Sequence, residues 1–187
     1  MNKFIFDVDG TLTPSRQQID MDFAVFFTDF CAENDVYLVT GSDREKTIEQ
    51  IGEEIYSLAQ RVYNCSGSDV WEGNVNVYTS EWNIPEEAEQ WLKAECRLSD
   101  FPLRTGLHID KRPGMVNFSV VGRDCSQEQR EEYYEWDNTS NERKNIARGI
   151  KYGWPDLDAV IGGEISIDIY KKGDDKSQTF EHIKNKH

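Results

Sequence analysis

The sequence is short of positive charge. Its 21 lysines and arginines stand against 35 aspartates and glutamates, which gives a formal net charge of −14. A protein that grips the phosphate backbone of nucleic acid usually presents a basic face, so this balance argues against nucleic acid as a partner. A solvated acidic surface explains the charge most simply, and a local cluster of arginines can still bind a small anion.

Cysteine is also scarce, and no long apolar run is present. The four cysteines are widely scattered and form no C-x-x-C pair, which argues against a zinc site. No signal peptide precedes the first apolar segment, and no run approaches the length of a membrane span. We therefore expect a cytoplasmic protein with reduced thiols and no membrane partner.

The first part of the chain alternates between short apolar runs and amphipathic segments. This pattern predicts buried strands at 4–8, 36–42 and 61–67, and helices at 20–34 and 42–55. Ser42 or Asp43 would cap the second helix. Strands that alternate with helices are typical of a parallel sheet covered on its faces by helices.

The pattern changes after about residue 74. Alternating segments predict antiparallel strands at 74–82 and 162–172 and a hairpin at 105–123 with its turn at Arg112-Pro113-Gly114. A helix is predicted at 85–101, and one or two helices at 125–154. A loop and a helix follow at 173–187. The sequence therefore predicts an α/β protein with a parallel-sheet core, residues 1–76 and 171–187, and an inserted α+β domain with an antiparallel sheet, residues 77–170.

Two carboxylates stand at the end of the first strand, in the stretch FIFDVDGT at 4–11. Residues i and i+2 of a strand point the same way, so Asp7 and Asp9 would converge. Such a pair favours a cation such as Mg²⁺, which takes oxygen ligands and commonly bridges carboxylate to phosphate. One carboxylate can then attack phosphorus while the other transfers protons, and Gly10 permits the sharp turn. An Asp-x-Asp alone is weak evidence and is better explained as two acids in a loop after a strand.

Later motifs strengthen the interpretation. DVDGT at 7–11, TGSD at 40–43 and the lysine of DDK at 174–176 resemble, in order, the first three motifs of the haloacid dehalogenase superfamily. The resemblance implies that Asp7 is the nucleophile and Asp9 the general acid/base. It also implies that Ser42 donates its hydroxyl to the phosphate and that Lys176 neutralises charge on the nucleophile and phosphoryl oxygens. Taken singly, Ser42 is explained as a helix cap and Lys176 as a surface lysine.

Three longer stretches narrow the resemblance. DVDGTLTPSR at 7–16, RPGMVNFSVVGR at 112–123 and GGEISIDIYKKGDDK at 162–176 are similar to the eukaryotic-type phosphomannomutases. The resemblance implies a Rossmann-like core with an α+β cap. It implies interconversion of mannose 6-phosphate and mannose 1-phosphate, which feeds GDP-mannose synthesis. The implied cofactors are Mg²⁺, with Asp7 and Asp9 as its ligands, and a hexose 1,6-bisphosphate activator.

The resemblance also implies a substrate site. Phosphate or its surroundings would contact Arg16, Arg112 and Arg123, because guanidinium groups match phosphate in bidentate fashion. Ser166 and Asp168 are two positions apart in a predicted strand, so they share one face of it and would both hold the phosphorylated hexose. The implied dimer contact lies in the cap, where the helix at 85–98 is the candidate for a homodimer. Pro113 departs from the family pattern, which usually has asparagine there.

The superfamily's fourth motif is a strand followed by acidic residues that complete the Mg²⁺ site. No Gly-Asp-x-x-x-Asp follows Lys176 in this sequence. The first strand would then be an apolar edge strand with unpaired backbone groups. We expect either a fragment of a longer chain or a strand supplied by a partner. From this chain alone we expect weak Mg²⁺ affinity and impaired turnover.

Two other functions stay open from the residues. A sugar-phosphate phosphatase would pass the phosphoryl group from Asp7 to water instead of a sugar hydroxyl. A non-catalytic hexose-phosphate binding fragment would bind ligand without phosphorylation of Asp7. Arg123 with Ser166 and Asp168 favours the mutase, because a phosphatase need not grip a second phosphate.

Overall fold

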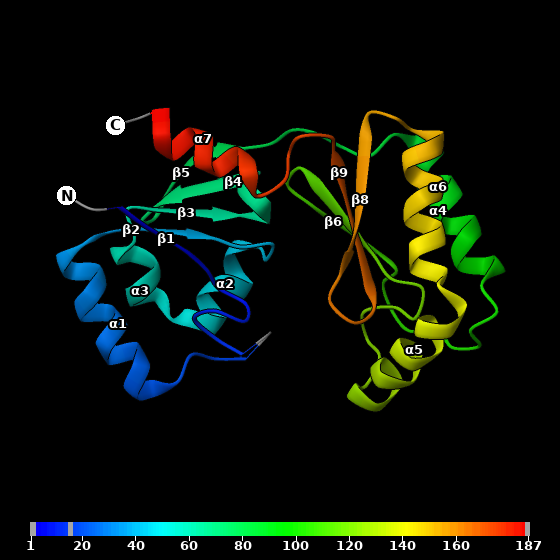
Figure 1. The fold of residues 1–187 in the computed structure, drawn as a ribbon, viewed down its shortest axis with the longest axis horizontal. Helices are drawn as coiled ribbons and strands as arrows, with labels where there is room; N and C mark the ends of the chain where they lie inside the picture. Colours follow the sequence, from blue (N-terminus) through cyan, green and yellow to red (C-terminus); the bar gives the residue numbers. More distant parts are fainter. Residues whose placement is uncertain (1–2, 15–16, 186–187) are drawn as a thin grey trace. The chain divides into compact units, whose positions relative to one another are not determined.

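The computed structural model describes residues 3–14 and 17–185, which belong to two compact units (Figure 1). The first unit comprises Met1–Glu81 and Asp174–His187, and the second comprises Trp82–Gly173. Within the described ranges, no helix is both long and apolar enough to span a bilayer. The four cysteines, all of them described, form no disulfide.

The first unit is built on a five-stranded sheet with the order β1-β2-β3-β4-β5. The first three strands are parallel, and the last two add antiparallel. Their bounds are β1 Lys3–Asp7, β2 Asp35–Val39, β3 Arg61–Asn64, β4 Asp69–Glu72 and β5 Val75–Thr79. Among the described residues β1 is an edge strand, as expected, and its Ile5 is 42% exposed.

The alternation of side chains in β2 assigns the two faces of this sheet. Val36 and Leu38 pack with the helices α1 Met21–Glu33, α2 Arg44–Ile51 and α3 Glu53–Leu58. Tyr37 and Val39 point to the other face, where Ile183 of α7 Ser177–Asn185 joins them. Because successive strand residues face opposite sides, both faces of the parallel part carry apolar side chains that helices cover.

Capping residues set the helix starts. The side chain of Asp20 accepts hydrogen bonds from the backbone at the start of α1, and Asp43 accepts one from Lys46 N at the start of α2. The single helix expected at 42–55 is wrong. Gly52 has φ +83°, which ends α2 and separates it from α3, because this backbone conformation is not helical.

The strand expected at 74–82 is also different in the structure. It is the shorter β5, it pairs with β4 in a hairpin, and it belongs to the first unit. All five of its residues are exposed, so the expectation of a half-buried strand is wrong. β4 was not predicted, because it is only four residues long and its apolar pattern is too short to be recognised as a strand.

The second unit contains a four-stranded antiparallel sheet with the order β6-β7-β9-β8. Its strands are β6 Ile109–Arg112, β7 Met115–Phe118, β8 Leu157–Gly162 and β9 Ser166–Lys171. The turn between β6 and β7 is Pro113–Gly114, as the hairpin motif predicts, and Gly114 has φ +65°.

Three helices complete the second unit: α4 Glu86–Leu98, α5 Gln127–Ser140 and α6 Glu142–Gly153. Helix α4 packs beside α6, and α6 packs on β8 and β9 (Figure 1). A capping box of Ser126 and Gln129 starts α5. Val116, Phe118, Ile167 and Ile169 point into the core on this side, so the intervening residues of β7 and β9 form a separate, more polar face.

Candidate active site

Asp7 is the last residue of β1, and it pairs in register with Val39 at the end of β2. Its Oδ1 accepts a hydrogen bond from Val8 N at 2.8 Å, and its Oδ2 lies 2.7 Å from Nζ of Lys176. The side chains of Asp7 and Lys176 are 41% and 45% exposed. The structure therefore places the proposed nucleophile and the proposed neutralising lysine in direct contact at a solvent-accessible position.

Asp9 lies two residues beyond Asp7, after the strand has ended. Val8 is fully buried, its carbonyl accepts from the backbone N–H groups of residues 11–13, and Gly10 takes φ +74°. The expected sharp turn at Gly10 is confirmed. Oδ1 of Asp9 accepts a hydrogen bond of 2.9 Å from Nε2 of Gln50, and the same amide lies 3.3 Å from Oγ1 of Thr13.

Gln50 was not found from the sequence. It occupies the last turn of α2 and is only 2% exposed, so its amide is held inside the protein. Its Oε1 is buried without a hydrogen-bond partner in the described part of the chain. A glutamine in a helix of charged residues gives no spacing signal, and only the packing of α2 against the opening turn brings it to Asp9.

Ser42 follows β2 in a turn. Asp43, not Ser42, caps α2, so the helix-cap explanation of Ser42 is wrong. The backbone N–H of Ser42 donates to Oγ1 of Thr40, and its carbonyl accepts from Cys65 N at 2.9 Å. Its hydroxyl has no protein partner among the described residues, which leaves it able to donate to a ligand.

A Mg²⁺ site would have to be built from few ligands. Among residues 3–14 and 17–185, no three or more His, Cys, Asp or Glu side chains are grouped as a metal site. Mg²⁺ is commonly held by one or two carboxylates together with substrate phosphate and water. The oxygens of Asp7 and Asp9 therefore fit the chemistry of this ion, with phosphate supplying further ligands.

The second unit carries the remaining candidates on the polar face of its sheet. Arg112 ends β6, and its guanidinium binds Oδ2 of Asp110 through Nη2 at 2.7 Å and Nε at 3.0 Å. Ser166 and Asp168 lie on one face of β9, as predicted. Asn117, opposite Asp168 in the register, donates to its Oδ1 at 2.6 Å.

The Arg123 guanidinium lies close to Asn117, Ser166 and Asp110. Its Nη1 lies 2.9 Å from Oδ1 of Asn117 and 3.5 Å from Oγ of Ser166, and Nη2 lies 3.9 Å from Oδ2 of Asp110. Burial, followed by the positive charge of Arg112, lowers the pKa of Arg123 from its usual value. An arginine stays charged even so. Arg112 and Arg123 therefore present two guanidinium groups that can bind an anion, although the carboxylates of Asp110 and Asp168 lie beside them.

Arg130 is a further cation of this group that the sequence did not reveal. It lies on α5, its Nε is 3.9 Å from Oε2 of Glu164, and its charge contributes to the lowered pKa of Arg123. Its side chain is only 13% exposed. In the sequence, Arg130 is surrounded by glutamates and glutamines, a pattern typical of a solvent-exposed helix face. Arg16, the remaining predicted phosphate ligand, lies outside the described residues.

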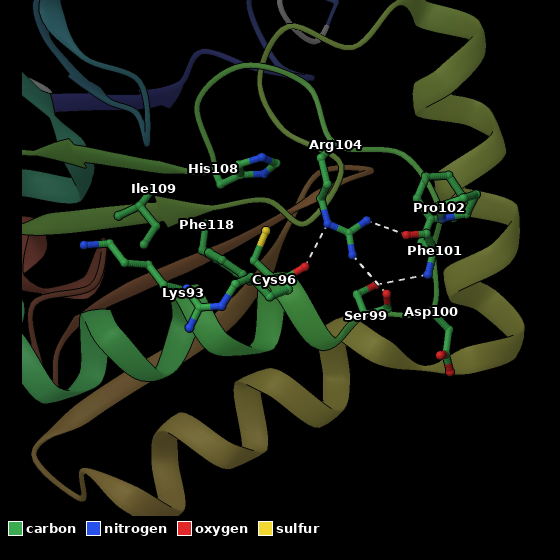
Figure 2. Close-up of a pocket in the computed structure, with 11 residues that line it drawn as sticks. Lys93, Cys96, Ser99, Asp100, Phe101, Pro102, Arg104, His108, Ile109 and Phe118 are labelled. Atoms are coloured by element: carbon green, nitrogen blue, oxygen red, sulfur yellow. Dashed lines mark hydrogen bonds between the residues drawn. The ribbon is translucent and has the colours of Figure 1, made fainter.

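A separate cavity of about 550 Å³ lies on the helix-covered side of β6, between the end of α4 and the following loop (Figure 2). Phe101 and Phe118 supply apolar lining, and Lys93 and His108 are polar members. Arg104 also lines it, but its guanidinium donates to the carbonyls of residues at the C-terminal end of α4 and in the following loop, namely Cys96, Ser99, Phe101 and Leu103. Arg104 is therefore occupied in holding a helix end, where cations are favourable.

Comparisons with known proteins agree with this fold. A family profile described as eukaryotic phosphomannomutase matches residues 23–187. A phosphomannomutase of Galdieria sulphuraria is 33% identical over 97% of this chain and 75% of its own length, and one of Spinacia oleracea is 30% identical over 97% and 76%. In fold, the chain resembles a sugar phosphatase of HAD superfamily subclass IIB, with a TM-score of 0.62 at 15% identity over 98% of this chain and 75% of that one.

Proposed function

The chain belongs to the eukaryotic phosphomannomutase family, and we propose that it interconverts mannose 6-phosphate and mannose 1-phosphate through a phosphate ester on Asp7, feeding GDP-mannose synthesis. The observation that carries the mechanism is the contact of 2.7 Å between Lys176 Nζ and Asp7 Oδ2. A carboxylate that is exposed, fixed at a strand end and paired with an ammonium group is suited to attack phosphorus.

Asp9 is the proposed general acid and base. It would protonate the sugar oxygen that leaves when Asp7 takes the phosphoryl group, and it would take the proton from the sugar hydroxyl in the return transfer. Its carboxylate is oriented by Gln50, which donates to Oδ1. The hydroxyl of Ser42 would donate to a phosphoryl oxygen, since it has no protein partner in the described ranges.

Mg²⁺ is the proposed cofactor, with Asp7 and Asp9 as its protein ligands. When bound, the ion supplies charge neutralisation that lets an anionic carboxylate approach an anionic phosphate. A hexose 1,6-bisphosphate is the proposed activator, because the Asp7 ester must be formed before the first sugar monophosphate can be converted.

The second unit would hold the phosphate that is not reacting. Arg112 and Arg123 are the proposed ligands of this phosphate, together with Arg130, because Arg112 and Arg130 lie close enough to Arg123 to lower its pKa and the Arg123 side chain is only 24% exposed. Ser166 and Asp168 would bind sugar hydroxyls from the same sheet face. Arg16 is proposed as a further phosphate contact from the family resemblance alone.

Phosphorus NMR tests the proposal directly. The protein is incubated with mannose 1-phosphate, Mg²⁺ and a catalytic amount of glucose 1,6-bisphosphate, and we expect the 6-phosphate signal to grow while total ester is conserved. Inorganic phosphate as the only product would contradict the mutase and support the phosphatase alternative. Asp7→Asn is the matched control, because it keeps the size of the side chain and removes the nucleophile.

Trapping of a phosphate mimic separates the enzyme from a binding fragment. With beryllium fluoride and Mg²⁺ we expect an adduct on Asp7. Repeating the experiment at a series of Mg²⁺ concentrations measures the Mg²⁺ requirement. A chain that binds mannose 1-phosphate but forms neither adduct nor product would be a non-catalytic module.

We further propose a cytoplasmic location and a homodimer built through the second unit. Leu98 and Leu107, near the cavity beside α4, are 74% and 55% exposed, and an interface would remove them from water. Light scattering on wild-type protein and on Leu107→Glu tests this contact. A monomeric wild-type protein would contradict it.

A further inference from the structure

The turn after β3 has an unusual backbone. Cys65 and Ser66 have φ +47° and +58°, and Gly67 follows with φ +99°. Non-glycine residues rarely adopt positive φ, and each such residue costs about 1–2 kcal/mol. Two in succession require that the surrounding contacts determine the turn.

Those contacts lead to the loop that carries Ser42. The N–H of Cys65 donates to the carbonyl of Ser42 at 2.9 Å, and the N–H of Ser66 donates to the carbonyl of Thr40 at 2.8 Å. The positive φ of Cys65 lies between these two N–H groups and helps to set their relative direction, because an extended residue there would turn them to opposite sides. The turn thus fixes the segment between β2 and α2.

The opposite side of the same turn contacts the start of α7. The carbonyl of Ser66 accepts a hydrogen bond of 2.9 Å from Nε2 of Gln178. A Cβ on Gly67 would lie 2.8 Å from Cγ2 of Thr179, so the helix approaches the backbone here as closely as glycine allows.

This first turn of α7 is continuous with Lys176. Oγ1 of Thr179 donates to the carbonyl of Lys176 at 2.7 Å, and Oδ1 of Asp175 accepts from Ser177 N at 2.7 Å. Movement of the first turn would therefore move the lysine whose ammonium lies 2.7 Å from Asp7.

We propose that Gln178 is a positioning residue for phosphoryl transfer: it binds the Ser66 carbonyl and so fixes the first turn of α7, which sets the place of the Lys176 ammonium beside Asp7. The proposal rests on the proposed role of Lys176. It goes beyond that role because it assigns a function to a side chain that touches neither substrate nor nucleophile.

Gln178→Met tests this, because methionine keeps the length of the side chain and removes the amide donor. We expect kcat to fall by about tenfold, since small misplacements of a charged group at the reaction centre are costly, while KM changes by less than about twofold. Gln60→Met, an exposed glutamine of the same unit, is the matched control and should keep wild-type kcat.

A second pair of variants addresses the same contact through packing. Gly67→Ala should displace the first turn of α7 and lower kcat. Thr179→Ser removes the methyl group nearest the added Cβ and keeps the hydroxyl that binds the Lys176 carbonyl, so the double variant should recover part of the loss. A merely destabilised protein would lose folded molecules, whereas the kcat of each folded molecule would stay at the wild-type value.

Lys176→Met separates the inference from the proposed function. If Lys176→Met abolishes turnover while Gln178→Met and Gly67→Ala keep wild-type kcat, the positioning role is wrong and the proposed function stands. If Lys176→Met itself keeps wild-type kcat, the role of the lysine and the positioning role of Gln178 fall together.

Discussion

Nζ of Lys176 lies 2.7 Å from Oδ2 of Asp7, although 169 positions separate the two residues in the chain. Asp7 and Lys176 come into contact because α7 packs on the face of the sheet toward which Asp7 points. Lys176 precedes the first turn of α7, so docking of this helix on Tyr37 and Val39 brings the ammonium to the strand end. The contact joins the beginning and the end of the first unit.

Loss of the ion pair between Lys176 and Asp7 should lower turnover but leave the free energy of unfolding almost unchanged. Lys176→Met is expected to reduce turnover by at least about a hundredfold, because charge on the nucleophile and the phosphoryl group would lose its neutralising partner. An exposed ion pair contributes about 0–1 kcal/mol to folding, so the free energy of unfolding should change little. Lys172→Met, at an exposed lysine four positions earlier in the chain, is the control. Urea unfolding together with the mutase assay checks both parts.

The order of most strands and helices could be predicted from the sequence, because apolar runs and turn residues mark the strands and their ends. The α/β core, the antiparallel sheet and the hairpin at Pro113–Gly114 follow from periodicity and turn residues. The break at Gly52 was missed because an isolated glycine in a helical pattern is often tolerated. β4 and β8 were missed because each lies beside a turn that obscures its pattern.

The sequence motifs named candidate residues of the site, but they did not name the residues that hydrogen-bond to them or lie beside them. Asp7 was named from its place at a strand end and from its motif, and Lys176 from its resemblance to a superfamily motif. Gln50, Asn117 and Arg130 were not, since each has an ordinary polar neighbourhood in the sequence and acquires its contact only when separate elements pack. Tertiary contacts of this kind have no local signature.

Gln50 should matter for both folding and turnover. Gln50→Leu removes the amide that donates to the Asp9 carboxylate and lies 3.3 Å from Oγ1 of Thr13. A hydrogen bond to a charged group contributes about 1.5–3 kcal/mol, so the free energy of unfolding should fall by about that amount. The substitution should also lower kcat, because the Asp9 carboxylate is no longer held by the amide. Gln90→Leu, at an exposed position of α4, should leave both quantities unchanged. Unchanged kcat in folded Gln50→Leu protein would contradict the orienting role.

Arg123 should govern substrate affinity. Arg123→Gln is expected to raise KM for mannose 6-phosphate by about tenfold or more, since a hydrogen bond to a charged group contributes about 1.5–3 kcal/mol. Arg123→Lys should recover only part of this, because an ammonium group lacks the planar fork of guanidinium. Arg97→Gln, at an exposed position of α4 beside the cavity, is the control. Equal KM values for both glutamine variants would remove Arg123 from the phosphate site.

Glu142 should make stability depend on pH. Burial raises the pKa of its carboxyl above the usual value, despite hydrogen bonds from Ser99 and Tyr133. The folded state then binds more protons than the unfolded state between the two pKa values, so stability falls as pH rises through that window. Glu142→Gln should be more stable than wild type at pH 7, by an amount of the order of 1 kcal/mol, and the advantage should vanish below the unfolded-state pKa. Urea unfolding at pH 4 and pH 7 measures the difference, and an equal difference at both values would contradict the assignment.

Ser66→Gly should stabilise the first unit. At φ +58° serine carries a steric cost that glycine lacks, and its side chain makes no hydrogen bond among the described residues, so the substitution should raise the free energy of unfolding by about 1 kcal/mol. The carbonyl that binds Gln178 is retained, so kcat should stay near the wild-type value. Ser57→Gly, at an exposed position inside α3, is the control and should destabilise by about 0.5 kcal/mol, because glycine disfavours a helix. A loss of stability in Ser66→Gly equal to that in Ser57→Gly would mean that the turn after β3 carries no strain.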